Sequence, residues 1–268
     1  MNSASETIGQ EMAILAHELR EPLTSILFAL ECTNDARNDE LTNRRMREIV
    51  QRQVRYVARI IDDVLDVGQL KHGRLSLHKE LIDIGSVIRA AIETNAPQIE
   101  KRKHRLSISL PRNPVLLMAD PLRLQQVVSN LLTNSAKYTE PGGSISVIAE
   151  ADGDTVKIDI RDTGIGISPE VLPQVFDLFH QGAVPRQGRF SGLGIGLALV
   201  KSLVELHGGS VTAHSEGAGT GSSFVVRLPG VTTVSSRDPD LLDHPSQPRP
   251  ANYRTVSRLE MAAVSSYS

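Results

Sequence analysis

The segment LAHELREPLTSI, which begins at Leu15, places a histidine directly beside a carboxylate and five residues before a proline. A carboxylate next to an imidazole can orient the ring and accept its proton, which makes the free ring nitrogen a better nucleophile. His17 lies two positions from both Leu15 and Leu19, so on a helix we expect it on the solvent side. An ordinary surface histidine is the alternative. Glu18 and Pro22 favour a site, because the proline predicts a bend just past the histidine.

A second candidate site is a polar stripe in ADPLRLQQVVSNLLTNSAKYT, where polar side chains recur at spacings of three and four. A solvated helix face is the ordinary explanation, although asparagine is an indifferent helix former. Amide oxygens suit a hard cation such as Mg²⁺ that already holds phosphate oxygens, and lysine offers a point charge to phosphate. The polar stripe contains Arg123, Gln126, Asn130, Asn134 and Lys137, and the adjacent apolar stripe contains Leu124, Val127, Val128, Leu131 and Ser135.

Three glycine-rich loops follow: DTGIGI, SGLGIGL and GAGTGSSF. Backbone amides at a helix start can hold anionic phosphate, although glycine in turns needs no function. Asp162, the first residue of DTGIGI, can accept a hydrogen bond from an exocyclic amine, as an adenine pocket requires. The polar stretch between Phe179 and Gly192, with Arg186 and Arg189, predicts a mobile lid over a ligand.

Two amphipathic helices are expected to carry the histidine. Their apolar residues recur at helical spacing on either side of a polar, turn-prone stretch at residues 33–43. Two helices alone cannot surround a core, whereas dimerisation into a four-helix bundle would bury both stripes. The stripes are Met12, Leu15, Leu19, Leu23, Ile26 and Leu30, then Met46, Val50, Val54, Val57, Ile61 and Val64.

The glycine loops and the polar stripe belong to a region of alternating strands and helices, residues 75–228. RLSISL, SISVIAE, TVKIDIRD, SVTAHSE and SSFVVRLP predict strands. Asp120 and Pro121 predict a helix start. This pattern indicates an α+β sandwich, a sheet with helices on one face. The segment from Val231 onward has four prolines between Pro239 and Pro250 and predicts a disordered tail.

Composition and charge limit the classes of protein to which this chain could belong. The 268 residues have a net charge of −2, so no strong attraction to nucleic acid or anionic lipid is expected. No apolar run approaches the roughly 20 residues that cross a bilayer, and the first residues lack a secretory signal. Cys32 is the only cysteine, which excludes an internal disulfide. A reducing cytoplasm fits these features best.

Taken in order, these segments resemble the catalytic core of bacterial two-component sensor histidine kinases over about residues 10–230. HELREPL resembles the phosphoacceptor box and NLLTNSAKYT the asparagine box; DTGIGI, FDLFHQ, GLGIGL and GTGSSF resemble the remaining ATP-binding boxes. The resemblance implies a helical-hairpin dimerisation domain that forms a four-helix bundle in the dimer, then an α/β sandwich of the histidine kinase/Hsp90-like ATPase type. The expected boundaries are a lead at 1–9, dimerisation at 10–73, ATP binding at 74–230 and a tail at 231–268.

The resemblance also implies roles for individual residues. His17 is the phosphoacceptor with Glu18 as its base, Asn130 positions the reacting groups, and Asn134 binds Mg²⁺. Lys137 and Tyr138 contact phosphate or nucleotide, and Asp162 recognises adenine in a pocket shaped by Gly164 and Gly166. Phe176 and Phe179 anchor the lid, and the nucleotide site further includes Gly192, Gly194, Gly196, Leu197 and Thr220.

The function implied by the resemblance is ATP-dependent autophosphorylation on His17, followed by phosphoryl transfer to an aspartate of a response-regulator receiver domain. ATP and Mg²⁺ are the expected cofactors, a second copy and a response regulator the expected partners. One alternative is a nucleotide-switched scaffold, or a fragment of a larger hybrid kinase without independent activity. Another is a chaperone- or MutL-like ATPase, which usually offers a glutamate at the position of Asn130.

Three features depart from the family pattern. Glu21 stands four residues after the histidine, where many members carry threonine or asparagine, so we expect weak phosphatase activity toward the regulator. Sixteen residues precede His17, so we expect the signal to arrive through a separate sensor protein or a longer chain. The tail after Pro229 resembles no receiver domain.

Overall fold

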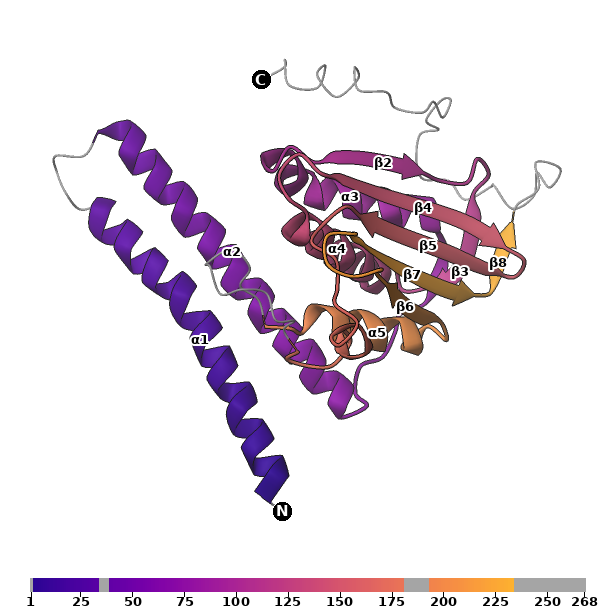
Figure 1. Cartoon of the computed structure of the whole chain (residues 1–268), viewed down its shortest axis with the longest axis horizontal. Helices are drawn as coiled ribbons and strands as arrows, with labels where there is room; N and C mark the ends of the chain where they lie inside the picture. Colours follow the sequence, from indigo (N-terminus) through magenta and orange to yellow (C-terminus); the bar gives the residue numbers. More distant parts are fainter. Residues whose placement is uncertain (1, 34–38, 181–192, 234–268) are drawn as a thin grey trace.

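The computed structural model describes residues 2–33, 39–180 and 193–233, and it contains a helical hairpin followed by an α/β domain (Figure 1). The hairpin consists of α1 (Asn2–Thr33) and α2 (Glu40–Lys71). The Asp39 side chain caps α2, because it accepts a hydrogen bond of 2.7 Å from the backbone N–H of Thr42. The fold class expected from the sequence, a helical hairpin followed by a sheet with helices, is confirmed.

Helix α1 continues through Pro22 without interruption, and Pro22 itself is buried. The hydroxyls of Thr24 and Ser25 donate hydrogen bonds to the carbonyls of Arg20 and Glu21. These side-chain bonds lie beside the position where the proline lacks a backbone N–H. The helix therefore remains helical across the residue at which the sequence predicts a bend.

The α/β domain is built on a five-stranded sheet in which the first pair is parallel and the other pairs are antiparallel. A smaller antiparallel sheet consists of β1 (Glu80–Asp83), β3 (Val115–Ala119) and β8 (Val231–Thr233), with β3 in the middle. From edge to edge, the large sheet contains β2 (Arg105–Ser109), β4 (Ser144–Asp152), β5 (Thr155–Asp162), β7 (Ser222–Pro229) and β6 (Ser210–His214).

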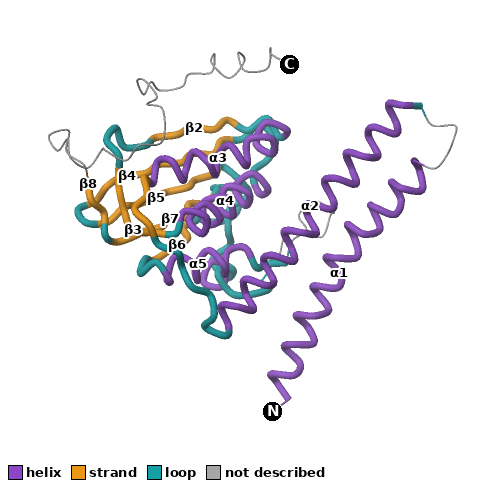
Figure 2. The backbone as a smooth tube through the Cα atoms, turned by 180° about the vertical axis from the view of Figure 1, so that it is seen from behind, coloured by secondary structure: helices purple, strands orange, loops and turns teal. Residues whose placement is uncertain are grey.

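Three helices cover one face of the large sheet (Figure 2). They are α3 (Ile84–Lys101), α4 (Pro121–Tyr138) and α5 (Gly196–Leu206), and a short 3₁₀ helix spans Leu172–Gln174. The main core lies between these helices and the sheet. The alternation in β5 is confirmed, because Val156, Ile158 and Ile160 are all buried.

Helix α4 carries the polar stripe of the candidate site, and its start follows the sequence prediction. Asp120 accepts hydrogen bonds of 3.1 Å from the backbone N–H groups of Leu122 and Arg123, and Pro121 is the first helical residue. The predicted buried stripe is confirmed. All of its members, Leu124, Val127, Val128, Leu131 and Ser135, are buried.

The two ends of the chain differ from the predicted boundaries. The segment expected as a lead, residues 1–9, is helical from Asn2, because a helix already formed extends at little cost per residue. At the other end, β8 lies beyond the boundary expected at residue 230 and pairs with β3. All three of its residues are β-branched, which suits a strand. The rest of the expected tail, residues 234–268, lies outside the described residues.

Candidate active site

The candidate phosphoacceptor, His17, is exposed on α1, as its spacing predicts. Glu18 points the other way and is 8% exposed. The hydroxyl of Tyr56 on α2 donates a hydrogen bond of 3.2 Å to the Glu18 carboxylate. Glu21 is exposed and lines a surface hollow together with His17 and Arg20. The predicted nucleophile is therefore accessible, whereas the predicted base is held against the second helix of the hairpin.

Three members of the polar stripe of α4, Arg123, Gln126 and Asn130, contact side chains of α2. Asn130 is buried, whereas Asn134 and Lys137 are half-buried. The Lys137 ammonium lies 4.7 Å from the centre of the Tyr138 ring. The backbone carbonyl of Tyr138 also accepts a hydrogen bond from Ile165, so the end of α4 is joined directly to the first glycine loop.

Asp162, at the end of β5, is fixed by donors to both of its carboxylate oxygens. Its Oδ2 accepts hydrogen bonds from the hydroxyls of Ser222 at 2.6 Å and Ser135 at 3.4 Å. Its Oδ1 accepts a hydrogen bond of 2.9 Å from the backbone N–H of Gly164. The carboxylate is buried and has a fixed orientation, as a residue that recognises one edge of a base requires. Sequence reasoning placed Ser135 in the core without assigning it this contact.

The first and third glycine loops contact each other through their backbones. Gly219 donates a hydrogen bond of 2.7 Å to the carbonyl of Ile165, and Gly221 donates one of 3.1 Å to the carbonyl of Gly164. Gly166 has a φ of +72°, and a side chain there would overlap the carbonyl of Gly217. Thr220 is exposed, and its hydroxyl bonds within its own turn. The glycines therefore permit the two loops to approach closely.

The second glycine loop is described from Leu193 onward, and the predicted site residue Gly192 lies outside the described residues, as do Arg186 and Arg189 of the expected lid. Gly194 has a φ of +69°, and its carbonyl accepts a hydrogen bond from Phe179. Gly196 is the first residue of α5, and Leu197 packs against the main core. Phe176 meets Phe224 edge to face, at 6.3 Å between ring centres.

A second hydrophobic cluster joins the hairpin to the α/β domain. Leu193 and Ile195 from the glycine segment are buried together with Ile60 and Val67 of α2. Leu15 and Leu19, the helical neighbours of His17, pack against the same cluster, as does Phe179. The helix that carries His17 and the glycine segment at residues 193–195 therefore contribute to one hydrophobic cluster.

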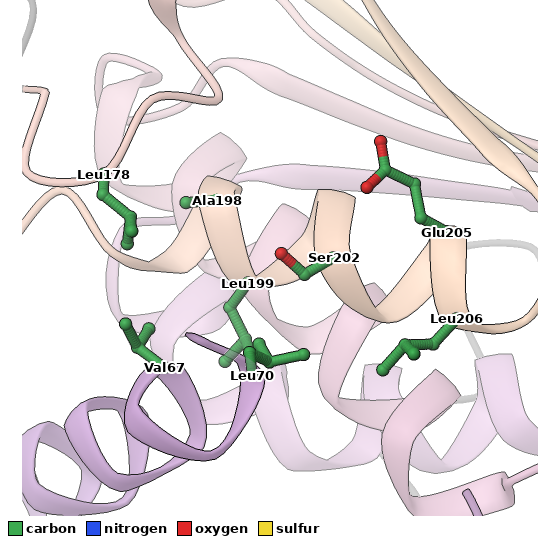
Figure 3. A pocket seen from close by; sticks show the side chains of 8 residues that line it. All are labelled: Val67, Leu70, Leu178, Ala198, Leu199, Ser202, Glu205 and Leu206. Carbon is green, nitrogen blue, oxygen red and sulfur yellow. The ribbon is translucent and has the colours of Figure 1, made fainter. Parts of the chain in front are cut away.

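A pocket opens beside this second hydrophobic cluster (Figure 3). Val67 and Leu70 from the last turns of α2 lie opposite Ala198 and Leu199 of α5, with Leu178 at one end. The pocket lies between the two structural units, not between Asp162 and the polar stripe.

Residues of α2 that sequence analysis did not assign to the site lie directly on the α4 stripe. Arg59 Nη2 donates a hydrogen bond of 2.6 Å to Asn130 Oδ1. Asp66 Oδ2 lies 2.7 Å from Arg123 Nη1 and 2.8 Å from Gln126 Nε2. Arg59 and Asp66 are single charged residues on an amphipathic helix, so no pattern in the sequence marks these contacts.

Another acidic residue of α2, Asp63, is half-buried near these contacts. Burial raises the pKa of its carboxyl to about 6, against the lowering effect of the Arg59 charge, and the charges of Asp66 and Asp62 add to the rise.

The residues fit a magnesium ion that takes most of its ligands from phosphate and water and few from the protein. Among the described residues, no group of three or more histidine, cysteine, aspartate and glutamate side chains could hold a metal ion. A half-buried amide such as Asn134, beside Lys137, suits an Mg²⁺ ion whose other ligands are phosphate oxygens and water. The site therefore fits magnesium that arrives with a nucleotide. The described helices also include none that is long and apolar enough to span a bilayer.

Two protein families match the chain. The family described as His Kinase A (phospho-acceptor) domain matches residues 7–73. The family described as Histidine kinase-, DNA gyrase B-, and HSP90-like ATPase matches residues 119–232. The two matches divide the chain as the structure does, into the helical hairpin and the α/β domain.

Similar proteins include several histidine kinases. The circadian input-output histidine kinase CikA of Synechococcus elongatus is 31% identical over 88% of this chain and 32% of its own length. The sensor histidine kinase RcsC of Escherichia coli K12 is 33% identical over 84% of this chain and 24% of its own length. Full-length ShkA, solved in complex with AMPPNP, has a TM-score of 0.59 at 26% identity over 85% of this chain and 47% of that chain. The chain thus spans about a third of the length of CikA and about a quarter of the length of RcsC.

Proposed function

The chain carries the catalytic core of the two-component histidine kinases, and we propose that it phosphorylates itself on His17 with ATP. The phosphoryl group then passes to an aspartate of a response-regulator receiver domain. In the first step, the imidazole attacks the γ-phosphorus, a P–N bond forms, and the bond to the leaving oxygen of ADP breaks. Glu18 is the proposed acceptor of the imidazole proton, and to reach it the carboxylate would have to leave Tyr56 and turn toward His17.

The observation that carries this proposal is the shared apolar contact between the phosphoacceptor helix and the glycine segment. Leu15 and Leu19 flank His17, and they pack against the cluster that buries Leu193 and Ile195. Phosphoryl transfer depends mainly on positioning and on neutralising charge. A chain that holds its histidine helix against a nucleotide-binding segment already supplies part of this positioning.

The remaining groups account for nucleotide recognition. Asp162 would accept a hydrogen bond from the exocyclic amine of adenine, since its carboxylate is fixed by Ser222 and Gly164. Asn134 would hold Mg²⁺, which supplies charge neutralisation to the phosphates when bound, and Lys137 would contact phosphate. The AMPPNP complex of the similar protein ShkA supports ATP as the nucleotide.

The exposed apolar residues of the hairpin support a homodimer. Leu23, Leu30, Val54 and Ile61 are 46–52% exposed in the single chain. A second copy that forms a four-helix bundle would cover them. A response regulator and a separate sensor protein remain the proposed partners, and the cytoplasm, where ATP is plentiful, the proposed location. Glu21 remains our reason to expect weak phosphatase activity toward the regulator.

The test is incubation of the full chain with γ-labelled ATP and Mg²⁺, beside His17→Ala and Asn134→Ala. We expect alkali-stable, acid-labile label on the unaltered chain alone, because phosphohistidine has that stability. Steady ATP turnover that persists in His17→Ala would contradict the kinase proposal and favour a chaperone-like ATPase. Nucleotide binding without any label would favour a nucleotide-switched scaffold.

A further inference from the structure

Glu18 is a carboxylate in a largely apolar environment. It is 8% exposed, although the residue before it, His17, is exposed. Its neighbours Leu15 and Leu19 are partly buried and pack against the second hydrophobic cluster. Successive residues of a helix are about 100° apart, so the Glu18 and His17 side chains leave α1 in different directions. The proposed proton acceptor therefore lies on the α2 side of α1, whereas the imidazole lies on the solvent side.

Tyr56 explains why the Glu18 carboxylate stays in this position. Helix α2, which carries Tyr56, runs beside α1 in the hairpin (Figure 1). The Tyr56 hydroxyl donates a hydrogen bond of 3.2 Å to Glu18 Oε2, and its ring is half-buried against the second hydrophobic cluster. A buried carboxylate without a donor is strongly disfavoured, and hydrogen bonds to a charged acceptor are among the stronger ones. Tyr56 therefore stabilises Glu18 in the position that faces α2.

The transfer of the imidazole proton requires a different position of the same side chain. A proton passes between two groups only at hydrogen-bond distance, directly or through one water. As the P–N bond forms, the imidazole N–H proton goes to a Glu18 oxygen, while the Tyr56 hydroxyl keeps its own proton and loses an acceptor. Glu18 thus has two positions, one held by Tyr56 and one turned toward His17, and only the second can accept the proton.

We propose that Tyr56 is a positioning residue of the phosphoryl-transfer reaction: it holds the Glu18 carboxylate on the α2 side and thereby limits how often Glu18 can reach His17. The proposal rests on the proposed function, because it takes His17 as the phosphoacceptor and Glu18 as the proton acceptor. If only the turned position is competent, the rate of transfer falls by the fraction of chains in which Glu18 has turned. The hydroxyl of Tyr56 then sets the speed of the reaction without touching the phosphate.

The first test compares the full chain with Tyr56→Phe, which keeps the packed ring and removes only the donor. Autophosphorylation is followed with γ-labelled ATP and Mg²⁺ over a range of ATP concentrations. We expect the rate constant at saturating ATP to rise about three- to tenfold, because the buried carboxylate has lost a donor and leaves its position more often. The ATP concentration for half-maximal rate should stay within about twofold, since ATP binding is not altered. An unchanged or lower rate constant in Tyr56→Phe would overturn the proposal.

A second background shows whether Tyr56 acts through Glu18. Glu18→Gln cannot accept the proton, so we expect its rate constant to be lower by roughly 100-fold or more. Adding Tyr56→Phe to Glu18→Gln should then change nothing, whereas an equal acceleration in both backgrounds would contradict a role through Glu18. Arg55→Ala is the matched control, because Arg55 is exposed beside Tyr56 and its hydrogen bond to the Gln51 carbonyl stays within α2. This variant should be labelled as fast as the unaltered chain.

The reactivity of His17 can also be measured without nucleotide. Diethylpyrocarbonate acylates imidazole nitrogen, and mass spectrometry gives the rate at each histidine at one fixed pH. A carboxylate beside the ring makes the free nitrogen a better nucleophile, so His17 should react faster in Tyr56→Phe and show no such gain in the Glu18→Gln background. The exposed His78 of the α/β domain should react equally in all variants, which also reports that they are folded.

The two measurements separate this proposal from the proposed function. Absence of phosphoryl label in every variant would contradict autophosphorylation, while the reaction with diethylpyrocarbonate would still decide whether Tyr56 keeps Glu18 away from His17. Equal rates at His17 in the unaltered chain and in Tyr56→Phe would show that the hydrogen bond does not restrain Glu18, and the proposal would be wrong.

Discussion

At the scale of single residues, Asp162 is the candidate adenine-binding residue, and the structure holds its carboxylate in one orientation. Its carboxylate accepts from Ser222 and Gly164, and an asparagine cannot accept on both sides of its side chain. Loss of a hydrogen bond to a charged acceptor costs about 1.5–3 kcal/mol. We expect Asp162→Asn to weaken ATP binding by roughly 10- to 100-fold in calorimetric titration, because 1.4 kcal/mol is tenfold. Asp154→Asn, in the exposed β4–β5 turn, should bind as the unaltered chain does. An unchanged Kd for Asp162→Asn would remove this residue from the site.

Asp63 gives a pH dependence with a definite sign. Its folded-state pKa of about 6 exceeds its ordinary value of 3.8, because burial disfavours the charged carboxylate. Between these values the folded chain binds more protons than the unfolded chain, so stability falls as pH rises through about 6. We expect Asp63→Asn to stabilise the protein by roughly 1–3 kcal/mol at pH 8 and by much less at pH 4, measured by urea denaturation. An equal effect at both pH values would show that Asp63 is not held in its neutral form by burial.

At the scale of secondary-structure elements, the last turn of α4 depends on a residue from the end of α3. One nitrogen of Arg102 donates to the carbonyls of Ala136 at 2.8 Å, Lys137 at 2.8 Å and Thr139 at 3.0 Å. A cation at a helix C-terminus is favourable. We expect Arg102→Ala to lower the free energy of unfolding by about 1–3 kcal/mol in chemical denaturation, and Arg102→Lys by less.

Arg105→Ala is the matched control for this cap. The exposed Arg105 side chain donates a hydrogen bond to Ser144 at the surface, so its loss should change stability by no more than about 0.5 kcal/mol. Equal stability of Arg102→Ala and the unaltered chain would mean that α4 ends without help from α3.

Most elements of the fold follow from local sequence, and the exceptions have physical reasons. The start of α4 was predictable because Asp120 and Pro121 act within one turn. Strand β8 was not, because Val231–Thr233 is too short to show a period and precedes a proline-rich segment. It forms because β3 offers an edge from more than 100 residues earlier, which no local pattern can reveal.

The residues of the candidate site also divide into those that the sequence reveals and those that only the folded structure reveals. Asn130, Asn134 and Asp162 stand out by type and spacing, so sequence alone singles them out. Arg59 and Asp66 do not, because each is an ordinary charged residue on an amphipathic helix until two units of the fold meet. Contacts between units depend on their relative position, which helical periodicity does not contain.

At the scale of the whole molecule, the hairpin is incomplete as a single chain. Leu23 on α1 is 49% exposed and Ile61 on α2 is 48% exposed, although both belong to the predicted apolar stripes. A two-fold dimer would bury each residue twice, once in each subunit. A glutamate at such a position would therefore place two unpaired carboxylates in the interface, at a cost of at least about 3 kcal/mol.

We therefore expect Leu23→Glu to convert a dimer to a monomer at micromolar concentration in analytical ultracentrifugation, a change of more than roughly 100-fold in the dimerisation constant. Leu122→Glu is the matched control: Leu122 is 75% exposed and belongs to α4, not to the hairpin, so this variant should remain a dimer. Dimerisation that survives Leu23→Glu, or is lost equally in Leu122→Glu, would contradict the four-helix bundle. Because each hairpin also contacts its own α/β domain through Ile60 and Val67 of α2, dimerisation and the position of that domain depend on the same helix.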